Sequence, residues 1–99
     1  MLAVVRNGCC EIQAPNGRKV LTLPPSNIDE AVMRGDYVAV VLRNGYSQLY
    51  KTTGQLVCTY SVHDAKFVKF HNDAQLAIHR RNGMTEIRDF HGRLIRVKS

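Results

Sequence analysis

Residues 38–60 read VAVVLRNGYSQLYKTTGQLVCTY, and this stretch decides the fold. A run of apolar residues ends at Arg43-Asn44-Gly45, and a mixed segment then leads to a second turn at Thr52-Thr53-Gly54. Asn-Gly accepts positive φ at both central positions of a type I′ turn and is a strong hairpin signal. A polar residue before Gly54 suits a loop with one left-handed position. The stretch therefore predicts three antiparallel strands joined by two tight turns.

The same pair of turns occurs three times along the chain, first in steps of 37 residues and then of 38. In each copy, nine positions separate the glycine of the first turn from that of the second. We predict that these residues are structural. The turn residues are Asn7, Gly8, Gly17, Asn44, Gly45, Gly54, Asn82, Gly83 and Gly92.

The segments between the turns predict strands. The apolar run 38–42 has counterparts at 2–5 and 76–78, and such runs fit strands covered on both faces. Further strands are expected after the first turn (9–13, 46–50 and 84–88) and after the second (19–23, 56–60 and 94–97). Copies two and three have one more strand in front, at 28–33 and 65–70, which copy one lacks. We expect a single domain, 1–99, with repeats at 1–25, 26–61 and 62–99.

A four-stranded meander that repeats about every 40 residues is typical of β-propeller blades. The chain resembles β-propeller repeats over nearly all its length, through its period, strand count and turn placement. A shorter likeness, over 88–94, is to tyrosine-aspartate (YD-type) repeats, and neither likeness transfers functional residues. The resemblance implies an all-β fold of three antiparallel meander repeats, with three, four and four strands. Propellers close with four to eight blades, so we expect completion as a homo-oligomer, with a compact monomer with capped ends as the alternative.

Composition and charge narrow the class of protein. Hydrophobic residues make up 44% and charged residues 22%, which is typical of a globular domain. The chain has no long apolar run and no recognisable signal peptide, so we expect a cytoplasmic protein that does not bind membranes. Cys9, Cys10 and Cys58 are interpreted as packing residues, because an odd count does not make a disulfide framework. The net charge is +6, of which +4 falls in residues 61–99.

The basic residues of the third repeat are the predicted partner-binding site. At the first turn of this repeat, Arg80 replaces the apolar Val5 and Leu42, so the third unit is the most polar. Neighbouring strands of a meander would bring several of these cations onto one surface, which favours an anionic partner. The alternative is a polar cap that keeps a terminal repeat soluble. The predicted residues are Arg80, Arg81, Arg88, Arg93, Arg96 and Lys98.

No motif indicates an enzyme, a cofactor or a metal site. The four histidines, at 63, 71, 79 and 91, are interpreted as solvent-facing, and the acidic residues lie mostly beside turns. We expect a non-catalytic module for protein–protein interaction, an adaptor or an inhibitor of a larger target, that binds through its repeat turns and basic face. The alternative is a nucleic-acid-binding protein that contacts phosphates. Phe90 is the only aromatic residue among the basic residues from Arg80 onward, which counts against single-strand binding.

Overall fold

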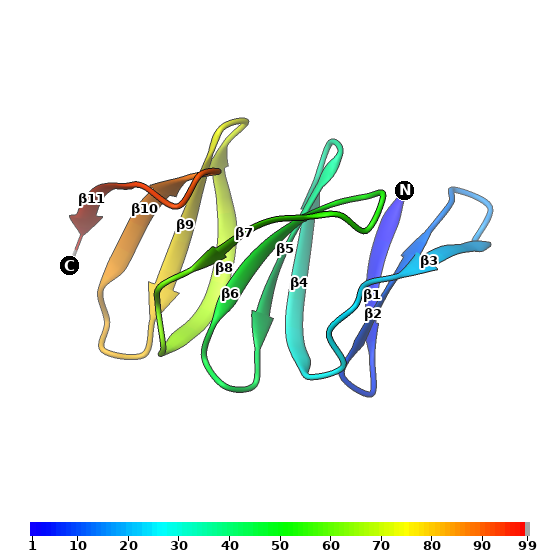
Figure 1. The fold of residues 1–99 in the computed structure, drawn as a ribbon, viewed down its shortest axis with the longest axis horizontal. Coiled ribbons are helices and arrows are strands. Elements are labelled where there is room, and N and C mark those ends of the chain that lie inside the picture. Colours follow the sequence, from blue (N-terminus) through cyan, green and yellow to red (C-terminus); the bar gives the residue numbers. More distant parts are fainter. Residues whose placement is uncertain (99) are drawn as a thin grey trace.

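The computed structural model describes residues 1–98, which form eleven strands and no helix. The strands make three antiparallel sheets, termed blades 1, 2 and 3 in chain order, and Figure 1 shows them in a row. This confirms the expected all-β fold of three, four and four strands. Blade 1 contains β1 (Leu2–Arg6), β2 (Cys9–Gln13) and β3 (Lys19–Thr22). Blade 2 contains β4 (Ile28–Arg34), β5 (Tyr37–Leu42), β6 (Ser47–Lys51) and β7 (Leu56–Tyr60). Blade 3 contains β8 (Ala65–Asn72), β9 (Gln75–Arg80), β10 (Thr85–Asp89) and β11 (Leu94–Lys98).

The apolar run of β5 is buried on both faces. Val38 and Val40 belong to the core between blades 1 and 2, whereas Ala39 and Val41 belong to the core between blades 2 and 3. Successive residues of a strand point to opposite faces, so a strand between two neighbouring blades has no polar positions. The continuous run in the sequence is therefore explained by the central place of blade 2.

Two separate apolar cores hold the three blades together. Because the side chains of each core come from two neighbouring blades, no blade buries its apolar face alone. The first core contains Cys10, Ile12, Leu23, Ile28, Val38, Val40, Leu42 and Tyr50. The second contains Ala39, Val41, Leu49, Tyr60, Val62, Ala65, Val68, Leu76 and Ile78.

The type I′ turn is present in blade 1 only. Asn7 and Gly8 have φ values of 50° and 81°, and they join Arg6 to its pairing partner Cys9. At Asn44 and Asn82 the prediction of a type I′ turn is wrong, because in these turns only the following glycine has positive φ.

The first turns of blades 2 and 3 are instead three-residue loops that end in a left-handed glycine. In blade 2, Gly45 N–H donates to the Leu42 carbonyl at 2.9 Å. The side-chain oxygen of Asn44 accepts from Tyr46 N–H at 3.1 Å, which holds the asparagine in an Asx turn. Asn82 makes the same bond to Met84 N–H, at 2.9 Å.

The extra loop residue has a physical cause in the front strands. Arg43 N–H donates to the Asn27 carbonyl at 2.7 Å, and Arg81 N–H donates to the Asp64 carbonyl at 2.9 Å. Asn27 and Asp64 immediately precede β4 and β8, so these bonds draw the arginines out of the ladder. Blade 1 has no front strand to supply such an acceptor, and its Arg6 stays paired with Cys9.

This difference corrects the alignment of the three copies in front of the first turn. By strand register, the counterpart of Leu42 and Arg80 in blade 1 is Arg6, and not Val5. Blade 3 is therefore not the only copy with an arginine at this position.

Within residues 1–98, no helix is long and apolar enough to cross a membrane.

Candidate functional site

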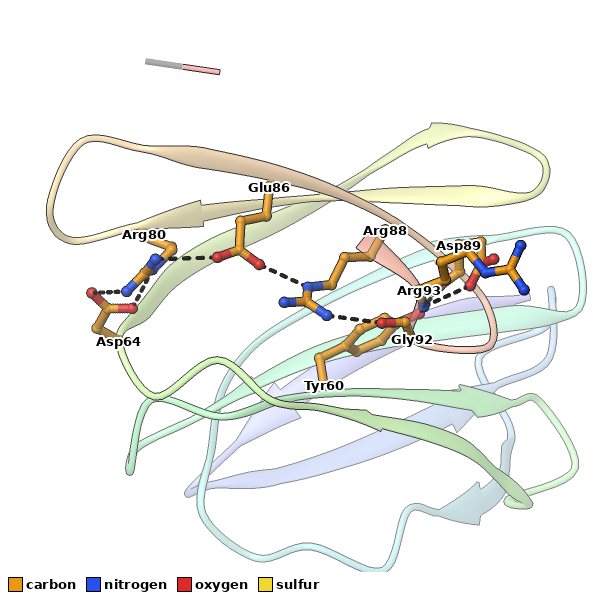
Figure 2. A network of polar contacts seen from close by, with 8 residues as sticks. All are labelled: Tyr60, Asp64, Arg80, Glu86, Arg88, Asp89, Gly92 and Arg93. Atoms are coloured by element: carbon orange, nitrogen blue, oxygen red, sulfur yellow. Dashed lines mark hydrogen bonds and ion pairs between the residues drawn. The ribbon is translucent and has the colours of Figure 1, made fainter. Parts of the chain in front are cut away.

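The six predicted partner-binding residues of the third repeat lie in four different places. Arg80 and Arg88 form ion pairs near the interface with blade 2 (Figure 2). Arg81 is exposed at the β9–β10 turn, and Arg93 is exposed after the β10–β11 turn. The remaining two, Arg96 and Lys98, are exposed on β11. The structure therefore brings together Arg80 with Arg88 and Arg96 with Lys98, but not all six.

A continuous polar chain ties Arg80 and Arg88 to two carboxylates. Arg80 donates from Nε to Asp64 at 2.7 Å and from Nη1 to Glu86 at 3.1 Å. Arg88 donates from Nε to the other oxygen of Glu86 at 2.7 Å and from Nη1 to the Gly92 carbonyl at 2.8 Å. The side chain of Glu86 is only 9% exposed, so it is a nearly buried charge held between two guanidinium groups. This chain fastens the β10–β11 turn and the start of β8 to the middle of blade 3.

Sequence reasoning missed the carboxylates of this network. Glu86 and Arg88 are two apart on one strand, so they share a face, and such a Glu-x-Arg spacing is a usable signal. No comparable local signal links Asp64 to Arg80, because they are sixteen positions apart and meet only through the pairing of β8 with β9.

We expect the Arg80→Gln variant to raise the pKa of Asp64. The hydrogen bond from Arg80 holds this pKa below the ordinary value of 3.8, so the ion pair stabilises the fold above the pKa of the unfolded chain. That contribution is lost as the pH falls through the lower pKa of the folded state. Carboxyl NMR titration measures the change. Asp89 is the internal control, since its pKa is lowered chiefly by the backbone N–H of Arg93, and an equal change at both residues would contradict the assignment.

The outer face of blade 3 is polar where the corresponding face of blade 2 is apolar. Strand register relates four positions on the two faces, and each of them carries a basic side chain or a histidine in blade 3. The exchanges from blade 2 to blade 3 are Val32 to Lys69, Val41 to His79, Cys58 to Arg96 and Tyr60 to Lys98. We term this surface the cap face; it also includes Phe67 and Thr85.

Aromatic and basic groups are organised on the cap face. The Phe67 and His79 rings stack with their centroids 4.2 Å apart, and Lys69 Nζ lies 5.6 Å from the Phe67 centroid. Thr85 Oγ1 lies 2.9 Å from His79 Nδ1. Burial and the nearby Lys69 charge lower the pKa of His79, which favours its neutral form. Phe90 does not contribute to this face, because it packs against Tyr37 with ring centroids 4.7 Å apart.

A groove lies beside β1, where blade 1 has one strand fewer than the other blades. The first strand of blades 2 and 3 has no counterpart in blade 1, so β1 is an edge strand. The groove is open and has a volume of about 650 Å³; its lining side chains are apolar, but polar and apolar atoms share its surface almost equally. Its lining residues are Met1, Leu2, Ala3, Ala31, Val32, Met33 and Gly35. We term it the β1 groove. The sequence indicated that the first repeat has one strand fewer than the others, but not that a groove lies beside β1.

Comparisons with known proteins do not assign the chain to a family. No protein-family model matches it, and no curated protein is similar to it at a significant level. The fold and the two surfaces define the class: an all-β repeat protein of three blade-like antiparallel sheets. Among residues 1–98, no group of three or more His, Cys, Asp or Glu side chains is placed to hold a metal ion.

Proposed function

We propose that this chain is a non-catalytic module that binds another protein, as an adaptor or as an inhibitor of a larger target. The observation that carries the proposal is the β1 groove, a hollow with apolar lining side chains beside a strand edge. Unpaired backbone groups at an edge are a ready template for another chain, and the apolar side chains next to them offer surface that a partner can bury. Sheet edges of this kind recur as sites for peptide recognition.

The cap face supports a second candidate function, the binding of nucleic acid. Lys69, Arg96 and Lys98 lie on this face with the ring of Phe67, and the combination of cations with an aromatic platform suits phosphates and bases. Such binding is salt-dependent, because each phosphate contact releases a counterion. The same cations also serve as the polar cap of a terminal repeat, so this face supports the second candidate less strongly than the groove supports the first.

Two matched variants distinguish the candidates in affinity capture from cell extract. The groove variant is Leu2→Lys, at a side chain that is 58% exposed and is therefore expected to leave the fold intact. The cap variant carries Lys69→Ser, Arg96→Ser and Lys98→Ser. We expect to capture a protein partner whose recovery is unaffected by nuclease and unchanged with the cap variant. With the groove variant its recovery should fall about tenfold, because the lysine places a charge in an apolar contact.

Other outcomes of the capture experiment decide against the proposal. Loss of the captured material with the cap variant, together with sensitivity to nuclease and to added salt, would favour nucleic-acid binding. Equal capture by both variants and the unmodified chain would exclude both surfaces. The expected homo-oligomer stays a prediction, and light scattering after size-exclusion chromatography measures it independently.

A further inference from the structure

We infer that the β1 groove accepts one extended segment of a partner protein, which pairs antiparallel with β1 and completes blade 1 as its fourth strand. The inference rests on the proposed function and names the partner's chemistry. Blades 2 and 3 show what occupies this position: in each, a front strand pairs antiparallel with the next strand of the sheet. The groove is the corresponding place in blade 1.

The backbone of β1 offers the hydrogen-bonding groups that such a strand needs. In a two-residue hairpin, the residues that flank the loop bond to each other, and alternate residues before them also face the partner strand. Arg6, Val4 and Leu2 therefore bond to β2. The N–H and carbonyl groups of Ala3 and Val5 point the other way, towards the open edge.

The register of blade 2 identifies the residues that would pair with these groups. Ala3 lies opposite Ile12 in blade 1, as Ala39 lies opposite Leu49 in blade 2, so Ala3 and Ala39 are equivalent. Ala39 pairs with Val32 of the front strand β4. The residue of the partner opposite Ala3 therefore takes the position of Val32.

The surroundings of that position determine the partner's side chains. Val32 packs against the core between blades 2 and 3, and its equivalent in blade 1 would face Ala31 and Met33 across the groove. An apolar side chain is favoured there, and a β-branched one fits a strand best. The neighbouring positions of the added strand point away from blade 2, so polar residues are suitable. The partner segment is thus a short extended strand with one apolar anchor.

A single segment fits this position better than a second copy of the chain. The front strands β4 and β8 are edge strands of their sheets, and no further strand lies beyond them within residues 1–98. Pairing with β1 of another copy would instead extend the sheet of blade 1 beyond four strands, unlike blades 2 and 3, which end at their front strands. At this edge, the net charge of +6 favours a segment with acidic flanks over a second, equally basic copy.

The probe is a labelled peptide with the sequence of residues 27–36, NIDEAVMRGD, because it contains the chain's own front strand and is acidic. We expect it to bind the full chain saturably, as measured by fluorescence anisotropy. N-methylation of the peptide at the position of Val32 removes a donor that points towards β1, and we expect about tenfold weaker binding. N-methylation at the position of Ala31, whose N–H points away, is the matched control and should change binding less than about twofold.

A variant of the protein tests the same contact from the other side. Ala3→Pro removes a donor at the open edge, where proline is tolerated, without removing a bond to β2. We expect Ala3→Pro to weaken peptide binding at least tenfold. Val4→Thr should retain peptide binding, because the N–H of residue 4 is directed to β2. Circular dichroism checks that both variants fold, and the N-methyl series uses the unmodified chain and does not depend on this check.

Three results would overturn the inference. Equal effects of the two N-methylated peptides would show that pairing is not strand-like. A dimer that Ala3→Pro dissociates would show that a second copy occupies the edge. If no peptide binds while a captured partner is still lost with Leu2→Lys, the proposed function stands and strand addition does not.

Discussion

Replacing Gly45 with alanine is expected to lower the free energy of unfolding by more than about 3 kcal/mol. Gly45 has a φ of +90°, which strains any residue with a Cβ, and an added Cβ would overlap the backbone carbonyl of His63. This carbonyl belongs to the connection between blades 2 and 3 and has little freedom to move, since Ala65 N–H donates to the Gly45 carbonyl at 2.9 Å. Urea denaturation measures the change.

Gly83 provides the control for this prediction. It occupies the same place in the turn of blade 3, with a φ of +87°, but an added Cβ would have no atom of residues 1–98 within 4 Å other than those of its chain neighbours. Gly83→Ala should therefore cost only the backbone strain, about 1–2 kcal/mol. The difference between the two losses of stability measures the cost of the overlap with the His63 carbonyl in the connection between blades 2 and 3. Equal losses would show that the turn of blade 2 does not constrain blade 3.

The Glu86→Ala variant is expected to lose about 3–5 kcal/mol of stability, because it leaves two guanidinium groups without their shared carboxylate. The side chains of Glu86 and Arg88 are only 9% and 13% exposed, so water cannot easily replace the lost partner. Arg80 keeps its contact with Asp64 at 2.7 Å, so the penalty falls chiefly on Arg88. Thermal and urea unfolding measure the effect.

The exposed ion pair between Arg34 and Asp73 is the matched control. Arg34 Nε and Asp73 Oδ1 are 2.9 Å apart, but the two side chains are 47% and 90% exposed. Asp73→Asn should change the stability by less than about 1 kcal/mol, because solvent screens such pairs. A loss as large as that of Glu86→Ala would contradict the view that burial makes the Glu86 network important.

The fold was predictable to the level of strands and sheets because its signals are local. Each sheet is a meander, so every strand pairs with its neighbour in sequence, and glycine turns mark where each hairpin reverses. The one-residue difference between the turn at Asn7 and that at Asn44 was not predictable. The extra loop residue at Asn44 depends on the hydrogen bond from Arg43 N–H to the carbonyl of Asn27, which precedes β4 and has no counterpart in blade 1. This bond joins segments that are distant in sequence.

The candidate site was predictable only as a local excess of charge. Arg88 and Arg96 both lie on strands of blade 3 and look equivalent in the sequence. In the structure, Arg88 forms an ion pair with Glu86, whereas Arg96 lies opposite Ile87 on the cap face. A shift of one residue in strand register reverses the face of every side chain, so the assignment of faces needs the packed structure.

The sequence by itself determined three antiparallel meanders and the burial of β5 on both faces, since turn chemistry and strand periodicity act over a few residues. Only the tertiary structure decided which cations are neutralised, which lie on the cap face, and that a groove remains beside β1. These properties depend on how whole sheets stack. Blade stacking is set by contacts between residues far apart in the chain, such as those that join Gly45 to Ala65 and Tyr60 to Asp89.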